Sequence, residues 1–175
     1  MIRYTDLVND TICAPVTPAG YSGVAIVRVS GGDCLSILKA FLDPKLEHPF
    51  ESHRAVLKKI FHPSRGHLMD SALVTFFKQG SSFTGDAVVE IACHGNPHLV
   101  SELTSALLEQ GCRLAEKGEF SFRAFKNGNI DPFRLKPSIS SSTVKTGPVL
   151  KLLWVHWVAS FPKSYWVLKR DFCAY

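Results

Sequence analysis

The sequence predicts an α+β fold: a mixed β-sheet with helices packed on one face of it. Three observations lead to this prediction. The chain has 175 residues, 46% of them hydrophobic, which is enough for one hydrophobic core. Strand-like segments outnumber helical ones, and they come partly in runs instead of alternating strictly with helices. Such an order is typical of α+β proteins and not of regular α/β folds.

The first half of the chain contains two predicted strands, a helix and two further strands. Residues 11–16 and 24–29 are apolar runs separated by a turn rich in proline and glycine. A helix is expected over 34–42, with Asp33 as its N-cap and Asp43-Pro44 as its stop. The two glycines before it suit a plain cap better than a phosphate site. Strands are expected over 54–61 and 70–77.

The second half begins with a polar turn that leads into a strand over 88–93. Asn96 and Pro97 then supply an N-cap and a first helical residue, and leucines at helical spacing predict a helix that Gly111 ends. A short strand over 112–115 and a helix over 118–125 complete the order β-β-α-β-β-β-α-β-α.

Arg28 and Glu90 are charged residues on predicted strand faces that are otherwise apolar. Side chains alternate across a strand, so Glu90 shares a face with Val88 and Ala92, and Arg28 shares one with Ile26. We expect the strand of Glu90 to be covered on both faces, where an unpaired charge is costly. Two interpretations stay open: a structural ion pair, with Arg28 reaching to water at a strand end, or a polar clamp in a small-molecule site.

Composition limits the class of protein and its compartment. Five widely spaced cysteines without a CxxC pair argue against a disulfide framework and a zinc ribbon, and they favour a reducing cytoplasm. The N-terminus has no apolar signal segment. The net charge of +5 lies in the tail, because residues 1–131 hold 13 basic and 14 acidic side chains. The globular part therefore gives no electrostatic case for binding nucleic acid.

Common catalytic motifs are not found in the sequence. There is no GxSxG nucleophile elbow and no GxxxxGK[ST] loop, so we expect no nucleotide hydrolysis by this chain. His94 and His98 have the spacing of metal ligands on a helix, but the turn between them separates their rings, and we expect no metal site.

The composition changes after Asp131. Residues 132–175 hold all three tryptophans and seven basic residues. The apolar run 149–161 is shorter than the roughly 20 residues that a spanning helix needs, so no membrane span is expected. We expect a folded domain over 1–131 and an atypical basic tail over 132–175, which is disordered or read out of frame.

Three segments together resemble the N-terminal domain of the MnmE (TrmE) family of tRNA modification GTPases. They are TPAGYSGVAIVRVSG at 17–31, SFTGDAVVEIACHG at 82–95 and RLAEKGEFSFRAFKNGNID at 113–131. The resemblance runs from about residue 9 to 131. It implies a fold like that of the folate-binding aminomethyltransferases.

The resemblance also implies a function. The domain would bind a one-carbon tetrahydrofolate such as 5-formyl-tetrahydrofolate through Arg28, Glu90 and Asn129, and it would form a homodimer. In the family, GTP, Mg²⁺ and K⁺ bind in a separate GTPase domain, which we expect to be missing from this chain. The full-length family protein works with the FAD-dependent partner MnmG on the wobble uridine of tRNA.

The sequence departs from the family pattern at several positions. Asn129 stands where the family usually has lysine, with Lys126 as a nearby substitute, and Lys117 and Asn96 replace a proline and a glycine. A truncated or frameshifted gene would explain the tail. Two alternative interpretations are a non-catalytic dimerisation remnant and a basic tail that binds nucleic acid or a membrane surface.

Overall fold

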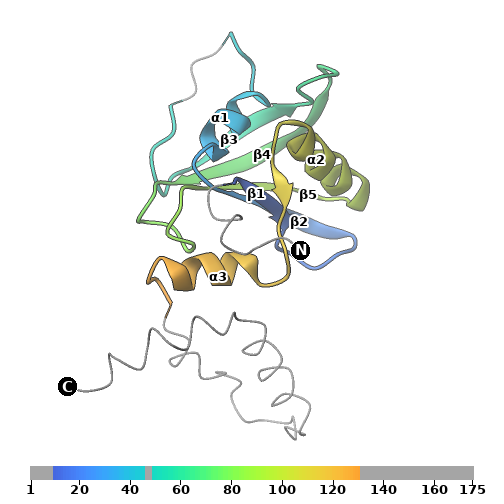
Figure 1. Cartoon of the computed structure of the whole chain (residues 1–175). Coiled ribbons are helices and arrows are strands. Elements are labelled where there is room, and N and C mark those ends of the chain that lie inside the picture. The colour runs from blue at the N-terminus through green and yellow to red at the C-terminus, as the bar shows by residue number, and fades with distance from the viewer. Residues whose placement is uncertain (1–9, 46–48, 131–175) are drawn as a thin grey trace, which may run out of the picture. The chain divides into compact units, whose positions relative to one another are not determined.

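The computed structural model describes residues 10–45 and 49–130 (Figure 1). In these residues six strands and three helices follow one another in the predicted order, and the α+β prediction is confirmed. The elements are β1 (Ile12–Pro15), β2 (Ser22–Ser30), α1 (Cys34–Lys39), β3 (Ala55–Phe61), β4 (Leu68–Phe77), β5 (Val88–Gly95), α2 (Pro97–Glu109), β6 (Arg113–Leu114) and α3 (Glu119–Lys126).

The six strands form one mixed sheet in the order β3-β4-β5-β2-β1-β6. All neighbouring strands are antiparallel except β1 and β6, which are parallel. The central pair is β2 and β5, whose register places Arg28 directly opposite Glu90. Two residues that are 62 positions apart in the sequence thus become cross-strand neighbours.

The hydrophobic core lies between one face of the sheet and the helices α1 and α2. Val27 and Val29 of β2 and Ile91 of β5 are at most 1% exposed, and they belong to one cluster with Phe41 and Leu107 from the helical layer. Every second side chain of β2 and β5 enters this core, as the alternation of a strand requires. The opposite face, which carries Arg28 and Glu90, is only half-buried.

The expectation that the helices share one face holds for α1 and α2 but is wrong for α3. Figure 1 shows α1 and α2 on one side of the sheet and α3 on the other. The ring of Phe120 in α3 lies against the guanidinium of Arg28, which projects from the face opposite the core. A run of eight helical residues carries no sequence signal for the face it will cover.

The helix ends show which capping signals were sufficient. Asn96 caps α2 as predicted, because its side chain accepts a hydrogen bond from the backbone N–H of His98 at 2.9 Å. Asp33 precedes α1, but its side chain makes no capping bond. Helix α1 ends at Lys39 instead of residue 42, since the chain tightens into hydrogen bonds from Phe41 to Leu38 and from Leu42 to Lys39.

The predicted tail over 132–175, including the apolar run 149–161, lies outside the described residues, so its organisation stays a prediction. Within residues 10–45 and 49–130, no helix is long and apolar enough to cross a membrane.

Candidate functional site

Arg28 and Glu90 form an ion pair on the open face of the sheet. Both Nε and Nη2 of Arg28 donate to the same carboxylate oxygen, Oε1 of Glu90, at 2.9 and 2.7 Å. The two side chains are 21% and 25% exposed, so the pair is partly shielded and still reachable from solvent. Oε2 of Glu90 and Nη1 of Arg28 form no hydrogen bond with any residue that the structure describes. The pair therefore offers one acceptor and one donor to a ligand.

The expectation that both faces of β5 are covered is only partly met. On the open face Val88 is 2% exposed, whereas the side chain of His94 at the other end of the strand is 74% exposed. Cover is thus confined to the end of the strand near Val88. There Thr84, in the loop over 81–86, contacts Ser30 of β2 through their hydroxyl groups at 2.9 Å.

Two phenylalanines flank Arg28, and sequence reasoning missed both as site residues. The guanidinium carbon of Arg28 lies 5.5 Å from the ring centroid of Phe83 and 5.4 Å from that of Phe120. Both distances are within the range of cation–π attraction. Phe83 comes from the turn before β5 and Phe120 from α3. The available signal was an aromatic residue in a polar turn that leads directly into the strand of Glu90.

Asn129, the third residue that the resemblance assigns to the site, lies at this same loop. Its side-chain amide donates to the backbone carbonyls of Ser82 and Phe83, at 2.8 and 3.3 Å. Asn127 holds the next residue in the same way, with 2.7 Å from its amide nitrogen to the carbonyl of Thr84. Asn129 is thus linked to Arg28 indirectly, through the loop that carries Phe83.

A network of buried and half-buried charges attaches α3 to the rest of the domain. Arg123 donates to Oδ1 and to the backbone carbonyl of Asp10, at 2.7 and 2.9 Å, and to Glu119 at 3.2 Å. Arg113 binds Asp10 and Glu119, both at 2.6 Å, and Asp86 lies 3.7 Å from Arg123. Arg123 and Glu119 are 4% and 3% exposed. The network holds the helix that carries Phe120.

The arginines of this network lower the pKa of two of its carboxyl groups, those of Asp10 and Glu119. Burial by itself would raise the pKa of Asp10, but hydrogen bonds and charge from Arg113 and Arg123 outweigh it and lower the pKa below 3.8. The pKa of Glu119 is likewise lowered below 4.5, against the effect of burial, by Arg113, a backbone N–H and Arg123. The hydrogen bond with Glu119 is the main reason that the pKa of Arg113 is raised.

His94 is paired with a carboxylate. Its Nδ1 lies 2.7 Å from Oδ1 of Asp70, and its backbone N–H donates to Oδ2 of the same residue. No group of three His, Cys, Asp or Glu in the part of the chain that the structure describes is arranged to hold a metal ion.

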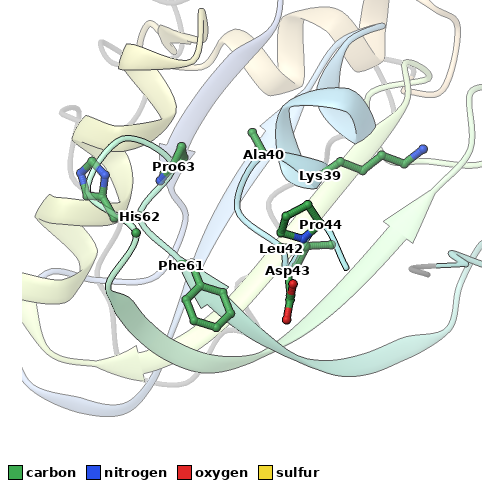
Figure 2. A pocket seen from close by; sticks show the side chains of 9 residues that line it. Lys39, Ala40, Leu42, Asp43, Pro44, Phe61, His62 and Pro63 are labelled. Atoms are coloured by element: carbon green, nitrogen blue, oxygen red, sulfur yellow. The ribbon is translucent and has the colours of Figure 1, made fainter. Parts of the chain in front are cut away.

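The thiols and a hollow beside α1 do not contribute to this site. Cys13, Cys34, Cys93 and Cys112 are buried and free, and burial raises the pKa of Cys34 to about 12, which keeps it protonated. A hollow of about 410 Å³ lies between the end of α1 and the turn after β3 (Figure 2). Figure 2 shows its charged groups, on Lys39 and Asp43, pointing away from each other, so they do not converge on a ligand.

Comparison with known proteins gives one consistent result. Residues 11–129 match the family model described as GTP-binding protein TrmE N-terminus. A tRNA modification GTPase MnmE of Bdellovibrio bacteriovorus is 43% identical over 131 residues, which are 75% of this chain and 27% of that protein. Proteins of the same name from Helicobacter pylori and Geotalea uraniireducens are 40% identical over 145 residues, covering 83% of this chain and 31% and 32% of theirs.

The chain thus spans about a third of the length of the curated relatives it matches. The family match covers β1 to α3, including both strands of the Arg28–Glu90 pair and the loop that carries Phe83. On this evidence the chain belongs to the TrmE N-terminus family and corresponds to the N-terminal part of MnmE-type proteins.

Proposed function

We propose that this chain is the folate-binding and dimerising N-terminal part of a tRNA modification GTPase. The observation that carries the proposal is the Arg28–Glu90 pair, in which one carboxylate oxygen and one guanidinium nitrogen face away from the ion pair. A carboxylate suits a ring edge with adjacent N–H donors, and an arginine suits a carbonyl or carboxylate. A one-carbon tetrahydrofolate such as 5-formyl-tetrahydrofolate has these groups.

The surroundings of the pair fit such a ligand. Phe83 and Phe120 supply apolar, flat surfaces beside Arg28, as expected for a small-molecule site with few polar contacts. Asn129 adds an amide oxygen at the edge of the loop, because its nitrogen is occupied by the carbonyls of Ser82 and Phe83. The chain's residues would bind and orient the folate, and the folate would supply the one-carbon unit.

The remaining activities of the family are proposed for the whole protein. The relatives carry the name tRNA modification GTPase, and they extend well beyond the part that this chain matches. We propose that modification of the wobble uridine, the sites for GTP, Mg²⁺ and K⁺, and the interaction with MnmG belong to a full-length cytoplasmic protein in which residues 1–131 form the first domain. The tail over 132–175 has no proposed role in binding.

Glu90→Gln is expected to weaken binding of 5-formyl-tetrahydrofolate by roughly tenfold or more, because a charged hydrogen bond to the ring edge is lost. Isothermal titration of the full chain measures this directly. Glu51→Gln is the matched control, since Glu51 forms an exposed pair with Arg54 just before the edge strand β3, which β4 separates from β5. Equal affinity in wild type and Glu90→Gln would exclude Glu90 as a ligand, and absence of binding to wild type would contradict the proposed function.

The open sheet face also offers a surface for a second copy. The register aligns Leu57, Leu73, Ala92 and Ile26 in one row across four strands. Leu57 and Leu73 are 65% and 48% exposed. Val24, next to the row, is 55% exposed. Contiguous exposed apolar residues are typical of protein interfaces. We therefore propose this row as the dimerisation surface.

Leu73→Glu is expected to shift the dimer toward monomer by at least roughly tenfold in dissociation constant, since a charge would be buried in an apolar interface. Sedimentation velocity over a range of concentrations measures the shift. Leu108→Glu on α2, where the leucine is 40% exposed on the opposite side of the sheet, is the control and should remain dimeric. A dimer that withstands Leu73→Glu but not Leu108→Glu would place the interface on the helical side.

A further inference from the structure

Phe83 is an exposed aromatic ring held over the charged pair. It is 47% exposed, although its ring centroid lies only 5.5 Å from the guanidinium carbon of Arg28. An arginine plane stacks well on aromatic faces, so this contact fixes one side of the ring. The rest of the ring is exposed to solvent close to the Arg28–Glu90 pair.

The loop that carries this ring is held by hydrogen bonds in which the ring itself takes no part. Thr84 is fully buried and contacts Ser30 in β2 through the hydroxyl groups, and the N–H of Gly85 donates to Oγ of Ser82. From the other side, Asn129 donates to the carbonyls of Ser82 and Phe83. The position of the Phe83 ring therefore does not depend on burial of the ring itself. This is the design of a preorganised contact surface.

We propose that Phe83 is a specificity-determining residue of the ligand site and that Asn129 is a positioning residue that acts through it. Phe83 stacks on a planar heterocycle whose N–H edge is bound by Glu90. Asn129 keeps the Phe83 ring in place by donating to the backbone carbonyls of Ser82 and Phe83. This inference rests on the proposed function, because it concerns the same ligand class. It adds a requirement for aromaticity at position 83 that the charged pair alone does not impose.

The experiment compares Phe83→Tyr, Phe83→Leu and Glu90→Gln by isothermal titration with 5-formyl-tetrahydrofolate. Tyrosine keeps the aromatic face and should bind within about threefold of wild type, whereas leucine keeps the apolar volume and should bind roughly three- to tenfold more weakly. Thermal unfolding of each variant checks the fold. Because Phe83 is exposed, we expect the unfolding midpoint of its variants to be unchanged.

Asn129→Ala and the double variant with Phe83→Leu test the positioning role. If Asn129 acts through Phe83, the double variant binds no more weakly than Phe83→Leu alone, whereas an independent ligand contact gives additive losses. Additive losses overturn the role of Asn129. Wild-type affinity in Phe83→Leu, together with a loss in Glu90→Gln, overturns the role of Phe83 and leaves the proposed function intact. Wild type that binds no folate overturns both.

Discussion

An Arg123→Ala variant is expected to lose about 3–5 kcal/mol of its free energy of unfolding. Arg123 is 4% exposed and contacts Asp10, Glu119 and Asp86, so its removal leaves the buried Glu119 and two half-buried carboxylates with fewer donors. Chemical denaturation followed by circular dichroism measures the loss. Because α3 carries Phe120, folate affinity should fall together with stability.

Arg54→Ala is the matched control for this prediction. Arg54 also pairs with a carboxylate, at 3.1 Å from Glu51, but the two side chains are 67% and 72% exposed. Such surface pairs contribute less than about 1 kcal/mol. Similar losses in Arg54→Ala and Arg123→Ala would show that burial of the network contributes nothing.

The effect of Arg123→Ala should depend on pH in a defined direction. The folded-state pKa values of Asp10 and Glu119 are lowered by the arginines, below the ordinary values of 3.8 and 4.5. Their stabilisation is therefore present above those values and is lost as the pH falls through the lowered ones. The stability difference between wild type and Arg123→Ala should be constant near neutral pH and shrink below about pH 4.

Local signals in the sequence were sufficient for the elements and for the central pair. The order of strands and helices follows from apolar periodicity and turn residues, and Asn96 with Pro97 identified the start of α2. Arg28 and Glu90 were noticed because each charge interrupts an apolar strand face. They form an ion pair with each other because an isolated, partly buried charge would cost free energy.

Long-range arrangements could not be predicted in the same way. Nothing in the two residues of β6 indicates that they pair in parallel with β1. The charges of the α3 network come from positions as far apart as Asp10 and Arg123, which carry no spacing signal. The contact of Phe120 with Arg28 could not be predicted either, because the face that α3 covers depends on this network and not on its own periodicity.

Gly95 shows how one small residue supports both fold and site. It pairs with Ser22 at the end of the β2–β5 ladder, the same ladder that sets Arg28 opposite Glu90. A Cβ atom at position 95 would lie 2.7 Å from the carbonyl carbon of Ser22 and collide with its carbonyl oxygen and Oγ. Backbone atoms, unlike the end of a flexible side chain, cannot move aside without disturbing the strand pairing.

Gly95→Ala is therefore expected to reduce the free energy of unfolding by about 1–3 kcal/mol or more, the usual cost of forcing atoms into a packed site. It should also weaken folate binding, because a shift of β2 against β5 separates Arg28 from Glu90. Gly23→Ala is the matched control on the same strand, since a Cβ there meets nothing within 4 Å. Thermal unfolding and folate titration of both variants measure the two effects. If Gly95→Ala unfolds earlier but keeps wild-type affinity, the β2–β5 register tolerates the collision and the geometry of the pair does not depend on Gly95.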